Sequence, residues 1–314
     1  MKPVYCIGEL LIDFVAEKQG NNLSKALEFT KKAGGAPANV ACAISKLGGN
    51  SSIIGAVGQD PFGTFLLDVL ESNKVDTSLA QRVGTFTTLA FVSLAEDGER
   101  DFVFNRGADK NLEYDSSVKL HFNDSLIHFG AATALLGGDL ENTYSKYFDD
   151  ALAQNAFISF DPNFRIDLWK GNEDTFIKKC IPFIEKSQLC KFSLEEAQLL
   201  SGKTELEDCC DYFHALGTQI ITITLGGEGT FLSTPSSKNT ITSIPVSPLD
   251  TTGAGDAFIG CLLQQISELE NPHKISEDLN RLIGMVKNAN KAGAITTTGY
   301  GAISSLPTSK EVFG

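Results

Sequence analysis

Residues that cross-link or anchor a protein are scarce in this sequence of 314 residues. It has seven cysteines, but they are scattered and no pair has the C-x-x-C spacing, so we expect reduced thiols rather than a disulfide framework or a zinc site. No window of about 18 uncharged apolar residues occurs, so no membrane span is expected. Residues 1–12 are too short and too polar for a signal peptide, and we therefore expect a cytoplasmic protein.

Positive charge is also scarce. The chain has 26 Lys and Arg against 39 Asp and Glu, which gives a formal net charge of −13. Nucleic acids are held by clustered Lys and Arg, so we expect no nucleic-acid partner. A small phosphate ligand remains compatible with this charge, because backbone N–H groups and a metal ion can hold it.

Two common nucleotide-binding motifs are missing as well. The pattern G-x-x-x-x-G-K-[ST] does not occur, which argues against a P-loop enzyme. No G-x-G-x-x-G follows a predicted strand, which disfavours a dehydrogenase that binds a dinucleotide. The four histidines are dispersed and match neither a zinc-protease motif nor a catalytic triad, so we expect them to be structural.

What is present is an alternation of short β-rich runs and helical segments. This alternation predicts an α/β fold with a mainly parallel sheet, and the length suits one large domain with an appendage. Predicted strands cover residues 4–7, 52–57, 125–129, 157–161, 189–192 and 220–225. Predicted helices cover residues 38–47, 62–70, 257–266 and 288–294.

The segment 84–109 breaks the alternation, because it reads as two strands around an Asp-Gly hairpin signal at residues 96–99. Residues 14–33 contain further short antiparallel strands. We interpret 14–33 and 84–109 as a small β-sheet lid inserted into a single domain of residues 1–314. Apolar residues alternate along the lid, so we expect two chains to pair through it as a homodimer.

The strongest chemical signal is Asp250-Thr251-Thr252-Gly253-Ala254-Gly255-Asp256-Ala257-Phe258. Two glycines just before a helix allow backbone N–H groups to converge on an anion at the positive end of the helix dipole. A carboxylate beside that anion is useful if it takes a proton from a hydroxyl that attacks phosphorus. Taken alone, Asp256 could equally be an acidic residue that the helix dipole stabilises.

The second signal is Gly34-Gly35-Ala36-Pro37-Ala38-Asn39-Val40-Ala41. The glycine pair allows a ligand to approach the backbone, and the amide of Asn39 offers donors and an acceptor to a polyol. The alternative is an ordinary helix start, which Pro37 in the first turn would suit.

These two segments resemble the two signature sequences of the PfkB, or ribokinase-like, family of carbohydrate kinases. The similarity covers nearly the whole chain and includes residues 8–13, 58–63 and 224–229. Within the family, residues 104–109 and 161–165 look most like those of fructokinases. The resemblance implies a ribokinase-like, Rossmann-type sandwich that transfers the γ-phosphoryl group of Mg·ATP to a sugar, with fructose as the expected acceptor.

The resemblance also implies roles for individual residues. The catalytic set is Asp256 as general base, Gly253, Ala254 and Gly255 as anion hole, and Arg165 as a cation near sugar and phosphate. The sugar-binding set, which shares Asp256, is Asp13, Gly34, Gly35, Asn39, Arg106 and Asp109. The nucleotide-binding set, which shares Gly253 and Gly255, is Ser193, Thr224, Gly226, Gly227, Gly229 and Asn290. The set for a monovalent cation, expected to be K⁺, is Asp250, Thr252, Thr296, Gly299, Gly301 and Ser305.

One stretch departs from the family pattern, which weakens the metal assignment, and one assignment has a competing interpretation. The family often shows Asn-x-x-Glu where this chain has residues 193–196, so Glu196 keeps its indirect role towards Mg²⁺ while Ser193 replaces the asparagine. Arg106 and Asp109 could equally form an ion pair at the base of the lid hairpin.

Other functions stay open at this stage. Within the class, the acceptor could be ribose, a keto-deoxy sugar acid or a nucleoside such as adenosine, although an acid would need more cations than the two arginines of residues 100–109. Outside it, the chain could be a catalytically silent, kinase-like interaction protein or a sugar-binding regulator. The intact Gly253, Gly255 and Asp256 argue against a silent protein.

Overall fold

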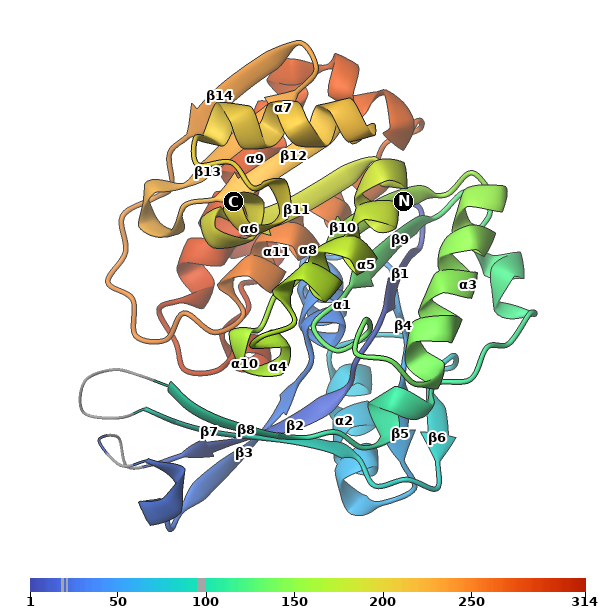
Figure 1. The fold of residues 1–314 in the computed structure, drawn as a ribbon. Coiled ribbons are helices and arrows are strands. Elements are labelled where there is room, and N and C mark those ends of the chain that lie inside the picture. The colour runs from blue at the N-terminus through green and yellow to red at the C-terminus, as the bar shows by residue number, and fades with distance from the viewer. Residues whose placement is uncertain (18–19, 21, 95–99) are drawn as a thin grey trace.

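The computed structural model describes residues 1–17, 20, 22–94 and 100–314. Among these residues, eight strands form a large sheet in the order β14-β13-β12-β11-β10-β9-β1-β4 (Figure 1). The strands are β1 (Val4–Ile7), β4 (Ser51–Ile54), β9 (Leu126–Gly130), β10 (Phe157–Asp161), β11 (Leu189–Ser193), β12 (Ile220–Thr224), β13 (Thr230–Thr234) and β14 (Ser237–Ile241). Neighbouring strands from β4 to β12 run parallel, whereas β13 is antiparallel to both β12 and β14. The predicted α/β class with a mainly parallel sheet is confirmed.

Helices cover both faces of this sheet, because successive side chains of a buried strand alternate between two apolar cores. One face carries α1 (Ala36–Lys46), α8 (Ala254–Ser267) and α9 (Leu279–Thr296). The other carries α3 (Asp139–Ala153), α5 (Glu173–Lys186), α6 (Leu194–Ser201) and α7 (Leu206–Leu216). The remaining helices are α2 (Pro61–Ser72), α4 (Ile166–Trp169), α10 (Ala302–Ser305) and α11 (Ser309–Phe313). No described helix is both long and apolar enough to cross a membrane.

Short 3-10 helices connect several of these elements. They are Leu23–Lys25, Ala108–Asn111, Val118–His121, Gly226–Glu228 and Pro272–Glu277.

One strand prediction needs correction. Residues 52–57 were expected to form a single strand, but the chain leaves the large sheet at Gly55. A Cβ at Gly55 would lie 2.7 Å from the carbonyl oxygen of Gly8, so the chain passes too close to its neighbour for a side chain. Beyond this crossing, β5 (Ala56–Gly58) pairs with β6 (Gln81–Val83) in a separate two-stranded sheet.

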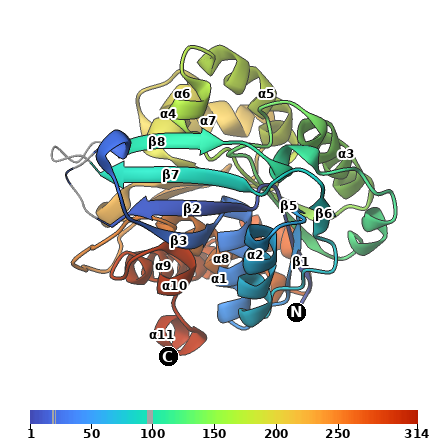
Figure 2. The ribbon, with the colours of Figure 1, turned by 90° about the horizontal axis from the view of Figure 1, so that it is seen from below.

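A small second sheet projects from the main body (Figure 2). Within the described residues it has the order β3-β2-β7-β8, formed by β2 (Leu11–Ala16), β3 (Phe29–Gly34), β7 (Thr88–Leu94) and β8 (Arg100–Asn105). The predicted small sheet is thus confirmed, while its hairpin turn at 96–99 lies outside the described residues. Strand β2 follows β1 closely and β3 leads directly into α1, so the small sheet is tied to two elements of the main domain.

On the face of the main sheet that α1 and α8 cover, the side chains of the strands change from apolar to polar along the strand direction. Near their amino ends, β9 to β12 present apolar side chains to this core, and these are Leu126, Phe157, Leu189 and Ile220. Closer to the carboxyl ends of the same strands, the residues on this face are His128, Asp161, Lys191 and Thr224. Polar groups are therefore gathered at the carboxyl edge of the sheet, where α/β sheets bind their ligands.

Candidate active site

The start of helix α8 forms the centre of this edge. Gly253 precedes the helix with a φ of 79°, a left-handed conformation that suits glycine. A Cβ there would lie 2.5 Å from the Cβ of Ala302 at the start of α10, so the turn is also tightly packed. No side chain caps this helix end. The first backbone N–H groups of α8 thus have no side-chain partner, although that of Ala254 donates to the carbonyl oxygen of Thr251 at 3.3 Å, and the binding of an anion by residues 253–255 stays a prediction.

Asp256 lies in the first turn of α8 and is only 8% exposed. The side-chain amide of Asn39 on α1 donates a hydrogen bond of 2.8 Å to its carboxylate oxygen Oδ2. Burial raises the pKa of Asp256 to about 6, although the bond from Asn39 acts in the opposite direction. Residues from the two signature segments, 217 positions apart in the chain, are thus in direct contact, and the carboxylate is ionised at neutral pH.

Two further acidic groups lie near the start of the small sheet. Asp13 on β2 pairs across the strands with Lys32 on β3, and burial raises its pKa to about 6. Glu9 is buried, accepts a hydrogen bond of 3.1 Å from the backbone N–H of Ala36, and has a pKa that burial raises to about 7. The charge of Asp256 acts on Asp13, which places two of the three predicted sugar-contacting carboxylates in one electrostatic environment.

The glycine pair at residues 34–35 allows the backbone to pass close to Asp13 and Glu9. A Cβ at Gly34 would lie 2.1 Å from Oδ2 of Asp13, and one at Gly35 would lie 2.4 Å from the carbonyl oxygen of Glu9. Gly35 also has a φ of 107°, which side-chain-bearing residues rarely adopt. The pair therefore allows β3 to pass over Asp13 and enter α1, which brings Asn39 to Asp256.

Arg165 is exposed at the start of α4 and donates a hydrogen bond of 3.0 Å to the carbonyl oxygen of Phe164. Its charge lowers the pKa of Asp13, Glu9 and Asp256 against the larger effect of burial. Arg165 thus brings a positive charge to this group of acids from an exposed position, and its contact with sugar and phosphate stays a prediction.

A buried ion pair lies on the sheet side of the same turn. Nζ of Lys191 on β11 is 3.0 Å from Oδ2 of Asp161 on β10, and both side chains are nearly inaccessible. The ammonium group also lies against the turn, 3.2 Å from where a Cβ of Gly255 would be. No sequence motif points to Lys191, yet the sequence holds one signal, since this lysine interrupts an otherwise apolar predicted strand.

The predicted nucleotide loop lies beyond β12. Gly226 and Gly227 are exposed, and a Cβ at either would meet nothing within 4 Å. Gly229 is buried, and a Cβ there would lie 2.1 Å from the carbonyl oxygen of Ile241. Thr224 at the end of β12 donates to the carbonyl oxygen of Phe192 at 3.3 Å. The loop therefore presents open backbone on one side and close packing on the other.

Two residues predicted for the nucleotide site have structural partners. Asn290 is buried on α9, where its amide donates to the carbonyl oxygen of Ile241 at 2.8 Å and accepts from the hydroxyl of Thr230 at 2.6 Å. Ser193 caps α6 by accepting from the backbone N–H of Glu196 at 3.2 Å. Their contacts with a nucleotide stay predictions.

Glu196 completes the capping box of α6. One of its carboxylate oxygens accepts from the backbone N–H of Ser193 and the other from that of Phe164, each at 2.7 Å. Burial raises the pKa of Glu196, while the charge of Lys191 opposes this effect. Ser193 thus fills the N-cap of α6, a position that an asparagine would suit equally well.

The residues predicted to bind a monovalent cation lie in two segments, 250–252 and 296–305, which we call the cation loops. Asp250 connects these two loops. One of its oxygens accepts from the backbone N–H of Thr252 at 2.9 Å, and the other accepts from that of Gly301 at 2.8 Å. The buried Thr296 donates to the carbonyl oxygen of Ala292 at 2.9 Å. A Cβ at Gly299 would lie 2.5 Å from Oγ of Ser305. Burial would raise the pKa of Asp250, but these hydrogen bonds lower it overall, so the loops share an anionic carboxylate.

Arg106 and Asp109 form the ion pair that the sequence offered as an alternative. Nε of Arg106 is 3.0 Å from Oδ2 of Asp109. The buried Asp109 also accepts hydrogen bonds from the hydroxyl groups of Thr88 and of Thr133, the latter at 2.9 Å. Arg106 donates a further bond of 3.0 Å to the carbonyl oxygen of Thr133. Both residues thus fasten the base of the small sheet to the main domain, and their contact with a sugar stays a prediction.

Comparison with known proteins places this arrangement in a family. The model of the pfkB family of carbohydrate kinases matches residues 1–309. The chain belongs to that family. Fructokinase-1 of Zea mays is 38% identical over 316 residues, which cover 98% of this chain and 96% of that protein.

Solved structures agree with this kinase along its whole length. Fructokinase of Xylella fastidiosa with bound ATP has a TM-score of 0.87 and 28% identity, covering 99% of this chain and 97% of that one. A double mutant of Vibrio cholerae fructokinase, bound to fructose, ADP and a potassium ion, has a TM-score of 0.83 and 28% identity over 100% of this chain and 97% of that one. The ribokinase-like fold class is confirmed, and the enzyme is a phosphotransferase that acts on a sugar.

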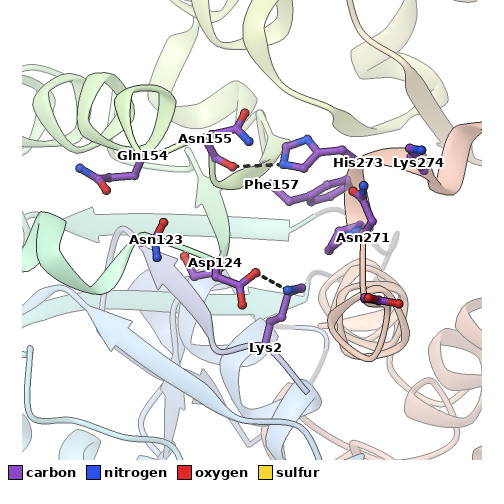
Figure 3. A pocket seen from close by; sticks show the side chains of 12 residues that line it. Lys2, Asn123, Asp124, Gln154, Asn155, Phe157, Asn271, His273 and Lys274 are labelled. Atoms are coloured by element: carbon purple, nitrogen blue, oxygen red, sulfur yellow. Dashed lines mark hydrogen bonds and ion pairs between the residues drawn. The ribbon is translucent and has the colours of Figure 1, made fainter.

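A separate cavity of this kinase lies at the opposite, amino-terminal edge of the sheet. It has a volume of about 620 Å³ and is lined by polar side chains around Phe157. Figure 3 shows Lys2 paired with Asp124, and His273 bonded at 3.1 Å to the carbonyl oxygen of Asn155. None of the predicted site residues lines it, so it is distinct from the phosphotransfer site.

Proposed function

We propose that this kinase transfers the γ-phosphoryl group of Mg·ATP to a hydroxyl group of fructose. The observation that carries the proposal is the buried carboxylate of Asp256, held by Asn39 beside the uncapped start of α8. That arrangement offers a proton acceptor and an anion-binding turn within one helical turn of each other. The similarity to fructokinases from Zea mays and Xylella fastidiosa supports fructose as the acceptor.

The reaction follows from these positions. Asp13 and Asn39 orient the sugar so that one hydroxyl lies between Asp256 and the γ-phosphorus, and such positioning can supply several kcal/mol of the barrier. The hydroxyl oxygen forms a bond to phosphorus while its proton moves to Asp256. The bond from phosphorus to the β,γ-bridging oxygen breaks, and ADP leaves. The amides of residues 253–255 and the guanidinium of Arg165 stabilise the charge on the transferring group.

Magnesium fits this scheme as part of the nucleotide substrate. Within the described residues, no three His, Cys, Asp or Glu side chains converge as a ready metal site. Both oxygens of Glu196 already accept backbone hydrogen bonds, which suits contact with Mg²⁺ through water rather than directly. When bound with ATP, the metal neutralises phosphate charge.

The small sheet is proposed to act as a lid. Asp13 lies on its strand β2, so closure of the sheet over the sugar would bring that carboxylate to the substrate and exclude water. Exclusion of water limits wasteful hydrolysis of ATP.

A panel of free sugars tests the proposed function. Purified protein with Mg·ATP is supplied with fructose, glucose, ribose, a keto-deoxy sugar acid or adenosine, and ADP formation is measured. We expect the highest kcat/KM with fructose. Activity on another acceptor would replace fructose in the proposal, and no ADP formation with any acceptor would leave the silent or regulatory alternatives.

The pH dependence of catalysis should reflect the buried acids. Burial raises the pKa of Asp256 to about 6, and the base works only in its ionised form. We therefore expect kcat/KM for the sugar to fall as pH decreases through about 6, whereas an unperturbed aspartate would hold it down to about pH 4. Initial rates measured between pH 5 and pH 8, at sugar concentrations well below KM, test this. A rate that stays constant down to pH 5 would contradict it.

Potassium is expected to activate the enzyme. The carboxylate of Asp250 joins the two predicted cation loops, and one of these loops directly precedes the anion turn. We expect K⁺ to raise kcat and Asp250→Asn to weaken that activation. Rates are compared in chloride salts of K⁺ and of a bulky organic cation at equal ionic strength. Identical rates in the two salts would count against the cation site.

Dimerisation through the small sheet is also expected. Phe86 and Val103 lie at this sheet and are 47% and 52% exposed, which leaves apolar surface for a partner. Sedimentation at micromolar concentration should show a dimer, and Val103→Lys should weaken it. A strict monomer would refute this expectation.

A further inference from the structure

Lys191 lies at the site but belongs to neither of the two signature segments. Its side chain is 9% exposed, and it lies on the central strand β11 between β10 and β12. Placing an ammonium group in a protein core is costly, so buried lysines are found where a partner or a function holds them. The partner here is Asp161, at 3.0 Å.

The surroundings of this ammonium group are strongly acidic. Besides Asp161 on β10, the carboxylates of Glu196 on α6 and Asp256 on α8 act on it and raise its pKa against the effect of burial. His128 on β9 adds no positive charge here. Burial lowers its pKa to about 4, and the charge of Lys191 acts in the same direction, so the imidazole is neutral. Three carboxylates therefore face one buried ammonium group, and Arg165 supplies a second cation from the exposed side.

The geometry also places Lys191 under the anion-binding turn. Its Nζ lies 3.2 Å from the position of a Cβ on Gly255, on the sheet side of α8. In the first turn of the same helix, the carboxylate of Asp256 accepts the hydrogen bond that Asn39 donates. A phosphoryl group held by the first amides of α8 would thus lie near both the ammonium group and the proposed general base.

We propose that Lys191 is a positioning residue for phosphoryl transfer, held by Asp161 so that its charge offsets the carboxylates beneath the 253–255 turn. This proposal rests on the proposed kinase function. Without the ammonium group, Asp161, Glu196 and Asp256 would repel the incoming phosphates and one another. With it, Asp256 stays ionised while the phosphoryl group binds next to it.

A purely structural ion pair is the competing explanation, and the pH profile of kcat/KM separates the two. The charge of Lys191 lowers the pKa of Asp256, whereas that of Asp161 raises it. Lys191→Met should therefore move the acidic limb of the profile to higher pH, and Asp161→Asn should move it to lower pH. A pair that only stabilises the fold would change the melting temperature and leave the limb in place.

The experiment measures kcat and KM from pH 5 to pH 8 for wild type, Lys191→Met, Lys191→Arg and Asp161→Asn, on the sugar that wild type phosphorylates best. We expect kcat of Lys191→Met to fall by about tenfold or more with a limb about one pH unit higher, and KM for the sugar nearly unchanged. Lys191→Arg should keep the limb near its wild-type position, because it retains the charge.

Lys179 provides a matched control. It is a partly buried lysine on α5 that pairs with Glu141 at 2.7 Å, on the other face of the sheet. Lys179→Met should leave kcat and the limb unchanged.

Two results would overturn the proposal. One is a wild-type pH profile of Lys191→Met. The other, which decides if Lys191→Met does not fold, is an acidic limb of Asp161→Asn that stays at its wild-type position. Wild-type protein inactive on every sugar would instead refute the proposed function.

Discussion

Replacing Asp256 by asparagine is expected to lower kcat by about 10²-fold or more while the affinity for the sugar stays nearly intact. The amide keeps the shape of the side chain, and its oxygen can still accept the hydrogen bond that Asn39 donates. What it loses is the capacity to take the proton of the attacking hydroxyl. Steady-state kinetics by coupled ADP release measure kcat, and sugar binding is measured separately by calorimetry.

A stability measurement serves as the control for this variant. Because burial raises the pKa of Asp256, its ionised form is less favourable in the folded protein than in the unfolded chain. This destabilisation grows as pH rises from about 4 to about 6 and is then complete. Asp256→Asn should therefore melt at or above the wild-type temperature at neutral pH. Wild-type turnover in a folded variant would remove the general-base assignment.

Gly253→Ala is expected to lower both stability and activity. Gly253 has a φ of 79°, and a new Cβ would lie 2.5 Å from the Cβ of Ala302. The left-handed conformation costs about 1–2 kcal/mol for alanine, and relief of the clash must move α10 or the start of α8. Movement of the first amides of α8 away from the phosphoryl group should lower kcat by about 10²-fold, as loss of an oxyanion-hole donor does. Thermal unfolding and steady-state kinetics test both effects.

Gly202→Ala is the matched control for backbone strain. Gly202 ends α6 with a φ of 67°, and a Cβ there would meet nothing within 4 Å. This variant should lose about 1 kcal/mol of stability and keep the wild-type kcat. Equal kcat values for the two alanine variants would show that the turn at Gly253 does not hold the reacting group.

The parts of the site that could be predicted from the sequence are those encoded by local rules. Glycines before an apolar helix specify a turn with free N–H groups, so residues 253–256 could be placed before the fold was known. Strands such as 4–7 and 157–161 agree with β1 and β10 because a short apolar run between polar segments indicates a buried strand. The contact of Asn39 with Asp256 could be inferred only from the resemblance to a family.

The parts that were missed depend on contacts between distant segments. The pairing of Lys191 with Asp161 requires that β10 and β11 lie side by side, and their register is set by the whole sheet. Helix α9 begins at Leu279, nine residues before the predicted start, because Asp278 caps it by accepting from the backbone N–H of Arg281 at 3.1 Å. The polar first turns of that helix gave too weak a periodicity to indicate its beginning.

A crystal structure of the wild-type enzyme with fructose and a non-hydrolysable ATP analogue tests the central claim most directly. We expect one fructose hydroxyl within hydrogen-bonding distance of the carboxylate of Asp256, with the γ-phosphate of the analogue on the backbone amides of residues 253–255. A fructose molecule bound away from Asp13 and Asn39, or a γ-phosphate remote from the start of α8, would contradict the account.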